Sequence, residues 1–142
     1  MGCACGSHER PPLIDTDAGL LERVIANITA NAVRHSPEGA PVRLLAGQII
    51  DEQGRRVQIR VVDSGPGVAE VDREAMFAPF QRLGDVPRGS GVGLGLAVAR
   101  GLAEAVDATI EVEDTPGGGL TMIVTVPVAG SEFAVDPEGA TR

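Results

Sequence analysis

Three short polar or glycine-rich motifs interrupt the apolar segments of this chain, and their order limits the folds that it can adopt. Asn27 and Asn31 lie four residues apart, on one face of a stretch with the apolar spacing of a helix. Asp63 follows a run rich in Val and Ile and precedes two closely spaced glycines. Residues 89–95 alternate glycine with small or apolar residues before a second apolar stretch. The fold must therefore accommodate a polar helix face, a strand end and a glycine-rich helix N-terminus.

The spacing of apolar residues predicts alternating helices and strands. A helix begins at Asp17, a good N-cap residue, and ends at Ser36 and Pro37. Next come two apolar runs around a polar turn, which predict an antiparallel hairpin. The predicted elements after the first helix are strands 42–50 and 55–63, a short helical segment near 71–76, a helix from 91 to about 105, and strands 109–113 and 120–126. This order predicts an α/β two-layer sandwich, with helices packed on one face of a mixed, mostly antiparallel sheet.

The length of 142 residues and an apolar content of 43% suit one domain with one core. We expect this domain to span residues 11–129. Residues 1–10 have no periodicity and predict a disordered stub or an expression remnant, and residues 130–142 predict a flexible tail. Cys3 and Cys5 lack the histidine partners that a zinc site would need.

The composition argues against several classes of partner. The chain has a net charge of −8, three Phe and neither Tyr nor Trp, so it lacks the basic surface and the stacking rings that bind nucleic acid. All twelve basic residues are Arg, which excludes the Walker lysine of P-loop enzymes and the strand lysine of eukaryotic-type protein kinases. No apolar run approaches the roughly 20 residues that span a bilayer. We therefore expect a soluble fragment that contacts neither nucleic acid nor membrane.

The helix motif has two interpretations. Asn27 and Asn31 could hold a hydrated Mg²⁺ through their amide oxygens, and Arg34 and His35, one turn further on, could reach a phosphate or a ribose. Alternatively, these residues form a solvated polar stripe, since Asn is common on exposed helix faces.

The carboxylate and the glycines also have two interpretations each. Asp63 could accept the exocyclic amine of adenine, or it could only close an Asx turn at the strand end. The glycines of residues 91–95 could cradle phosphates with backbone N–H groups at a helix N-terminus, or they could form a flexible loop. Taken together, the three motifs predict a nucleotide pocket.

Joined in this order, the motifs resemble those of the ATP-binding catalytic domain of sensor histidine kinases, in the gyrase/Hsp90/MutL-like ATPase superfamily, which has the Bergerat-type ATP-binding fold. The likeness covers about residues 13–128 and rests on four sequence boxes. These are the N box at 22–36, the G1 box at 63–67, the F box at 76–80 and the G2 box at 91–97. Within the family, residues 80–85 and 113–121 look most similar to the potassium-responsive sensor kinases.

The resemblance implies that ATP and Mg²⁺ are the cofactors. It implies that Asn31 is the Mg²⁺ ligand, that Asn27 lies near the phosphates, and that Asp63 binds the adenine amine. The candidate contacts of the γ-phosphate are Arg34, Arg82 and Arg88. Residues 81–90 would form a lid over ATP. The further nucleotide contacts that it implies are His35, Gly65, Gly67, Val68, Phe80, Arg82, Gly91, Val92, Gly93, Leu94, Gly95, Leu96 and Thr121.

The same resemblance implies a protein-histidine kinase that delivers the γ-phosphoryl group of ATP to a histidine on a separate dimerisation domain. His8 lies before Pro11 and Pro12 in no helical context, so we expect the acceptor domain to be absent from this chain and the fragment not to autophosphorylate. The implied partners are that domain and a downstream response regulator, and the implied location is the cytoplasmic part of a membrane-bound sensor. Two alternatives stay open: an ATP-hydrolysing or serine-kinase member of the superfamily, and a non-catalytic nucleotide-binding module.

Overall fold

The fold is a four-stranded sheet with two helices on one of its faces. A computed structural model describes Ile14, residues 16–78 and residues 95–128 of the chain. The elements in chain order are α1 (Ala18–His35), β1 (Arg43–Asp51), β2 (Gly54–Val62), the 3₁₀ segments η1 (Glu70–Asp72) and η2 (Ala75–Phe77), α2 (Gly95–Ala105), β3 (Thr109–Asp114) and β4 (Leu120–Pro127).

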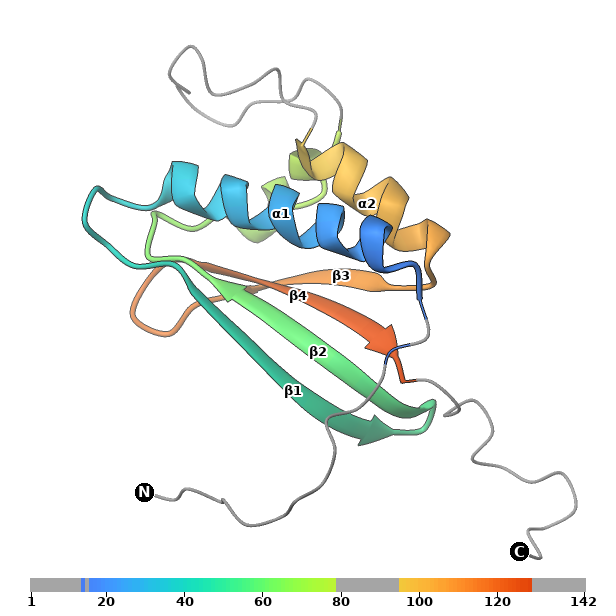
Figure 1. Cartoon of the computed structure of the whole chain (residues 1–142). Helices are drawn as coiled ribbons and strands as arrows, with labels where there is room; N and C mark the ends of the chain where they lie inside the picture. Colours follow the sequence, from blue (N-terminus) through green and yellow to red (C-terminus); the bar gives the residue numbers. More distant parts are fainter. Residues whose placement is uncertain (1–13, 15, 79–94, 129–142) are drawn as a thin grey trace, which may run out of the picture.

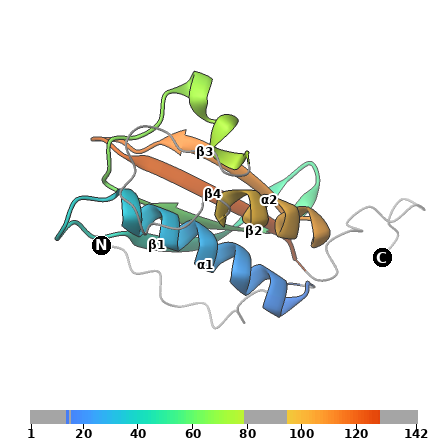
Figure 2. The same ribbon diagram turned by 90° about the horizontal axis from the view of Figure 1, so that it is seen from above.

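The strands lie in the order β1-β2-β4-β3, and each neighbouring pair is antiparallel. Helices α1 and α2 lie side by side over one face of this sheet (Figures 1 and 2). Ile14 adds an antiparallel bridge to Val128, just beyond the end of β4. The predicted two-layer α/β sandwich is confirmed, and every strand pair among the described residues is antiparallel.

Helix α1 packs on the sheet through one apolar stripe. Asp17 caps the helix because its side chain accepts a hydrogen bond from the backbone N–H of Leu20 at 3.1 Å. Val24, Ile28 and Ala32 recur every four residues and are buried. They belong to the same core as the buried valines of β2 and β4. This packing fixes the orientation of α1 and therefore of its polar residues.

Arg100 holds helix α2 against residues 74–77, which include η2. The guanidinium of Arg100 donates to both carboxylate oxygens of Glu74, at 2.6 and 3.2 Å, and lies 4.1 Å from the ring centroid of Phe77. The hydrogen bonds from Arg100, followed by its charge, hold the pKa of Glu74 below its ordinary value. Within the described ranges, no helix combines the length and apolar character needed to cross a membrane.

Replacing Ile28 with alanine tests the core under α1. Ile28 has no exposed surface, so Ile28→Ala is expected to lower the free energy of unfolding by about 2–5 kcal/mol. Val33 lies on the same helix but is 59% exposed, so Val33→Ala is expected to change it by less than about 0.5 kcal/mol. Urea unfolding followed by circular dichroism measures both values. Equal losses in the two variants would mean that α1 does not pack as described.

Candidate nucleotide-binding site

Asp63 comes directly after β2 and is a buried carboxylate, 4% exposed. Its Oδ1 accepts two backbone hydrogen bonds, from the N–H of Gly65 and from the N–H of Leu120, each at 2.9 Å. Its own N–H donates to the carbonyl oxygen of Leu120, also at 2.9 Å. The side chain therefore ties the loop after β2 to the start of β4.

The second carboxylate oxygen of Asp63 remains available. Both hydrogen bonds go to Oδ1, and no residue in the described part of the chain donates to Oδ2. A carboxylate can accept several hydrogen bonds, and a buried one is stabilised by each of them. The predicted Asx turn is thus present, because Gly65 donates to Asp63, and it leaves Oδ2 without a donor among the described residues.

The glycines of this site have steric reasons to be glycines. A Cβ on Gly65 would lie 2.3 Å from the carbonyl oxygen of His35, and a Cβ on Gly119 would lie 2.1 Å from the carbonyl oxygen of Asp63. Gly119 has a φ of +112° and Gly67 a φ of +77°, which side chains disfavour. The loop after Asp63 is therefore held between the end of α1 and the turn before β4, at distances that exclude any side chain.

The last turn of α1, which carries some of the predicted residues, adjoins this loop at His35. Asn31 is 8% exposed and Asn27 is half-buried, so neither belongs to a fully solvated polar stripe. Arg34 and His35 are exposed in the last turn of the helix. Because the carbonyl of His35 adjoins Gly65, Asn31 stands one helical turn from the loop that carries Asp63.

The other predicted residues divide into two groups. Val68 packs against the core, Leu96 is buried in it, and Gly95 begins α2. Thr121 is buried, and its hydroxyl lies 2.9 Å from that of Thr115 in a hydrogen bond. Six of the predicted contacts and the expected lid lie outside the described residues, namely Phe80, Arg82, Gly91, Val92, Gly93, Leu94 and residues 81–90.

Two residues of the site were missed by the sequence reasoning. Leu120 supplies one of the N–H groups to Asp63, and Gly119 allows the close backbone approach that makes this bond possible. The run of three glycines at 117–119 was the available signal, but it entered the sequence analysis only as part of the resemblance over residues 113–121. All three have positive φ, and only Gly119 of the three contacts Asp63.

The fold and the buried carboxylate beside a glycine loop define an α/β nucleotide-binding domain. The family model for histidine kinase-, DNA gyrase B- and HSP90-like ATPases matches residues 16–130. The chain is 51% identical over 117 residues to the sensor protein KdpD of Rathayibacter rathayi, covering 82% of this chain and 13% of that protein. It is 53% identical over 108 residues to KdpD of Mycobacterium tuberculosis strain CDC 1551 / Oshkosh, covering 76% and 12%.

The chain is also similar to a solved structure. Full-length ShkA in complex with AMPPNP is 32% identical, with a TM-score of 0.69 over 88% of this chain and 25% of that one. The chain therefore belongs to the family of histidine kinase-, DNA gyrase B- and HSP90-like ATPases, and within it to the ATP-binding domains of sensor histidine kinases.

Alanine substitutions at two neighbouring glycines test the close approach of Gly119 to the Asp63 backbone. Gly118 and Gly119 have similar φ values, +117° and +112°, but a Cβ on Gly118 meets nothing within 4 Å. Gly118→Ala is expected to cost about 1–3 kcal/mol of backbone strain. Gly119→Ala is expected to cost about 1–3 kcal/mol more, because its Cβ collides with the Asp63 backbone. Chemical denaturation measures the difference, and equal costs would contradict the described contact.

Proposed function

We propose that this chain is the catalytic domain of a KdpD-like sensor histidine kinase, which binds Mg-ATP and delivers the γ-phosphoryl group to a histidine on a separate dimerisation domain. The proposal rests on the burial and the hydrogen bonding of Asp63. This residue is buried, its Oδ1 is occupied by two backbone N–H groups, and its Oδ2 is free of donors from the described residues. The relationship to ShkA, which was solved with the ATP analogue AMPPNP, supports the same ligand.

Oδ2 of Asp63 would select adenine. The exocyclic amine of adenine donates a hydrogen bond, and an ionised carboxylate only accepts. Guanine has a carbonyl oxygen at the corresponding ring position, and two acceptors facing each other without a proton between them would be left unpaired. Gly65 and Gly67, and Val68 beside them, would form the wall of the adenine pocket.

Asn31 suits a magnesium ligand. Mg²⁺ prefers hard oxygen donors and usually retains several waters beside one or two protein ligands and the phosphates. Asn31 is a largely buried residue with an amide oxygen, on the helix that borders the Asp63 loop. When bound, Mg²⁺ neutralises phosphate charge, which matters here because the chain contains no lysine.

Asn27 and Arg34 would act on the phosphates without activating water. A neutral amide at Asn27 cannot take a proton from water, so ATP would be conserved until an acceptor arrives. Arg34, exposed near the end of α1, would contact the γ-phosphate. His35, Thr121 and the glycines of residues 91–95 complete the proposed ATP contacts, together with Phe80, Arg82, Val92, Leu94 and Leu96.

The rest of the proposal concerns the longer protein. The chain spans 12–13% of the length of its KdpD relatives. We propose that the full protein is a membrane-bound sensor whose cytoplasmic part contains this domain and its phosphoacceptor domain. Its downstream partner would be a response regulator in potassium or osmotic signalling, in keeping with the likeness to KdpD.

The variant Asp63→Asn tests adenine recognition without removing the structural acceptor. An asparagine keeps an oxygen for the N–H groups of Gly65 and Leu120 but places an NH₂ group where Oδ2 stands. We expect calorimetric titration with AMPPNP and Mg²⁺ to give about 10- to 100-fold weaker binding than for the wild type. Asp107→Asn is the matched control, because Asp107 is exposed and its φ of 59° suits asparagine. Unchanged affinity in a folded Asp63→Asn would refute the proposed role.

Supplying a phosphoacceptor domain in trans tests the reaction. We expect radiolabel from the γ-position of ATP to appear on its histidine, and Asn27→Asp to release more free phosphate than the wild type because it introduces a carboxylate base. Steady phosphate release by the wild type without transfer would favour the ATPase alternative. Binding with neither reaction would favour the nucleotide-binding module.

A further inference from the structure

Strand β1 presents an uncharged edge. It lies at the end of the sheet and pairs with β2 on one side, and no residue in the described ranges pairs with its other side. Arg43 and Asp51 are its first and last residues, and none of the residues between them carries a charge. Antiparallel pairing directs the N–H and C=O groups of alternate residues outward, so this edge can hydrogen-bond to another strand.

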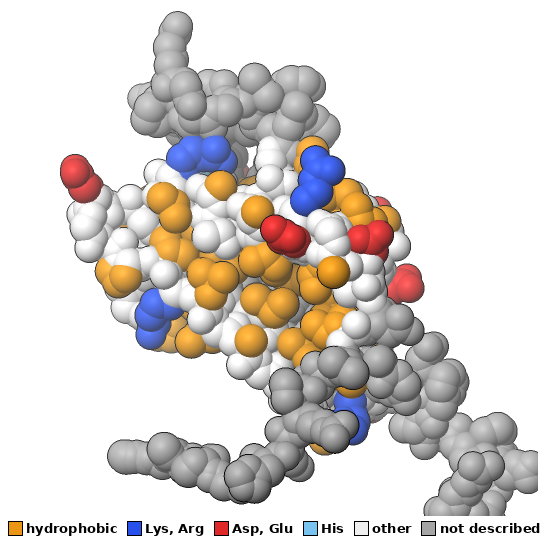
Figure 3. All heavy atoms as spheres, viewed as in Figure 1, with side chains coloured by type: hydrophobic (Ala, Val, Ile, Leu, Met, Phe, Trp, Pro, Cys, Tyr) orange, Lys and Arg blue, Asp and Glu red, His pale blue; other side chains and the backbone are white. Residues whose placement is uncertain are grey.

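The side chains of β1 are also exposed and apolar. Leu44 is 50%, Leu45 47% and Ile50 74% exposed. Figure 3 shows hydrophobic side chains spread over the face between α1 and β1, with the charged side chains toward its margin. Proteins usually protect an edge strand with charges, a proline or a bulge, and a long apolar edge without them favours pairing with another chain.

The opposite edge of the sheet has that protection. Strand β3 is only six residues long and includes Glu111, Glu113 and Asp114, all of them exposed. Glu113 and Asp114 have arginine partners in their own chain, Arg60 and Arg73. Two copies of β3 placed side by side would still bring acidic side chains of like charge together, which is unfavourable. The two edges therefore differ in kind, and only β1 suits self-association.

We propose that two copies of this chain pair through antiparallel β1 strands centred on Gly47, which joins their sheets into one of eight strands. The sequence of β1 is matched to itself about this centre. The resulting cross-strand pairs are Gly47 with Gly47, Ala46 with Gln48, Leu45 with Ile49, Leu44 with Ile50, and Arg43 with Asp51. Each end thus brings opposite charges together, and the apolar residues contact one another.

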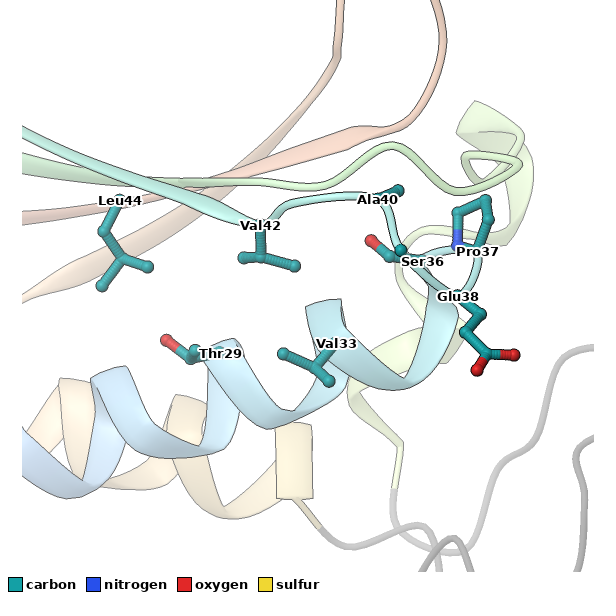
Figure 4. A pocket seen from close by; sticks show the side chains of 9 residues that line it. Thr29, Val33, Ser36, Pro37, Glu38, Ala40, Val42 and Leu44 are labelled. Carbon is teal, nitrogen blue, oxygen red and sulfur yellow. The ribbon is translucent and has the colours of Figure 1, made fainter.

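The pairing joins apolar surface on the side where the helices lie. Leu44 stands opposite Val61 in the β1–β2 register, and Val61 is buried beneath the helices, so Leu44 points to the same side. There it lines a groove of about 370 Å³ with Val42 and, from α1, Thr29 and Val33 (Figure 4). Ile50 of the second copy would lie next to Leu44 and extend the apolar floor of this groove.

The proposed contact limits the assembly to two copies. A two-fold axis through Gly47 uses the same edge of both copies, so no free β1 edge remains. Asp51 already pairs with Arg56 of its own chain, and Arg43 of the second copy would join that ion pair. The charged β3 edges would lie at the outer ends of the combined sheet, and we expect a dimer instead of a fibre.

A charge at Gly47 tests the dimer. A Cβ on Gly47 meets nothing within 4 Å in its own chain, so Gly47→Glu should fold, yet it places two carboxylates face to face across the axis. We expect sedimentation velocity in reducing buffer to show a concentration-dependent dimer for the wild type and for Gly47→Ala. Gly47→Glu should weaken dimerisation at least about fivefold. Gly101→Glu, at an equally open glycine on α2, is the matched control and should dimerise like the wild type.

A cysteine at the same position tests the register. Residues directly opposite in antiparallel strands have Cα atoms close enough for a disulfide. With Cys3 and Cys5 replaced by serine, Gly47→Cys should form a covalent dimer with oxidised glutathione, and Gly101→Cys should not. A wild type that stays monomeric at all concentrations would overturn the proposal. So would a dimer that neither Gly47→Glu weakens nor Gly47→Cys cross-links.

Discussion

The double hydrogen bond to Oδ1 of Asp63 is the interaction on which the site depends. It joins the end of β2 and the glycine loop that follows it to the start of β4, 57 residues further along the chain. Burying a carboxylate is costly unless it accepts hydrogen bonds, and here two backbone N–H groups offset that cost. The two hydrogen bonds hold Oδ1 in place. Because the carboxylate is rigid, they also fix the position of Oδ2. A side chain held in this way can discriminate between bases because it loses little freedom when a ligand binds.

The chain contains no lysine, so other groups must neutralise the phosphate charge of ATP. This limits the mechanisms available for phosphoryl transfer. Its basic residues are all Arg, and the polar residues proposed for the site on α1 include two neutral amides, Asn27 and Asn31. Amides and backbone N–H groups can position phosphates and a metal ion, but they cannot act as a strong base toward water. We infer that catalysis rests on positioning and charge neutralisation, which suits transfer to an acceptor on another domain better than hydrolysis.

Much of the fold could be predicted from periodicity. Helix α1 was expected from Asp17 to Ser36 and occupies Ala18–His35, and the hairpin was expected at 42–50 and 55–63 and occupies Arg43–Asp51 and Gly54–Val62. These elements are long, with clear caps and turns, so local sequence determines them. The place of Asp63 at the end of β2 was predicted for the same reason.

The contacts between segments could not be predicted in this way. Gly119 is essential to the site because β4 passes close to Asp63, and no local pattern reports that approach. Likewise, no local pattern reports the hydrogen bond between the hydroxyls of Thr115 and Thr121. The pairing of Arg100 with Glu74 and Phe77 joins residues that are more than twenty positions apart. Sequence spacing indicates which side chains can bind a ligand. The backbone groups that hold those side chains in position are set by tertiary packing.

Adenine recognition by Asp63 can be tested by comparing ATP with inosine triphosphate, which has a carbonyl oxygen in place of the adenine amine. Affinities of both nucleotides for the wild type and for Asp63→Asn would be measured by calorimetry in the presence of Mg²⁺. We expect the wild type to prefer ATP by about 10- to 100-fold and Asp63→Asn to lose or reverse this preference, since an amide NH₂ can donate to the inosine carbonyl. Equal affinities of the wild type for the two nucleotides, or a preference that survives in Asp63→Asn, would contradict this role of Asp63.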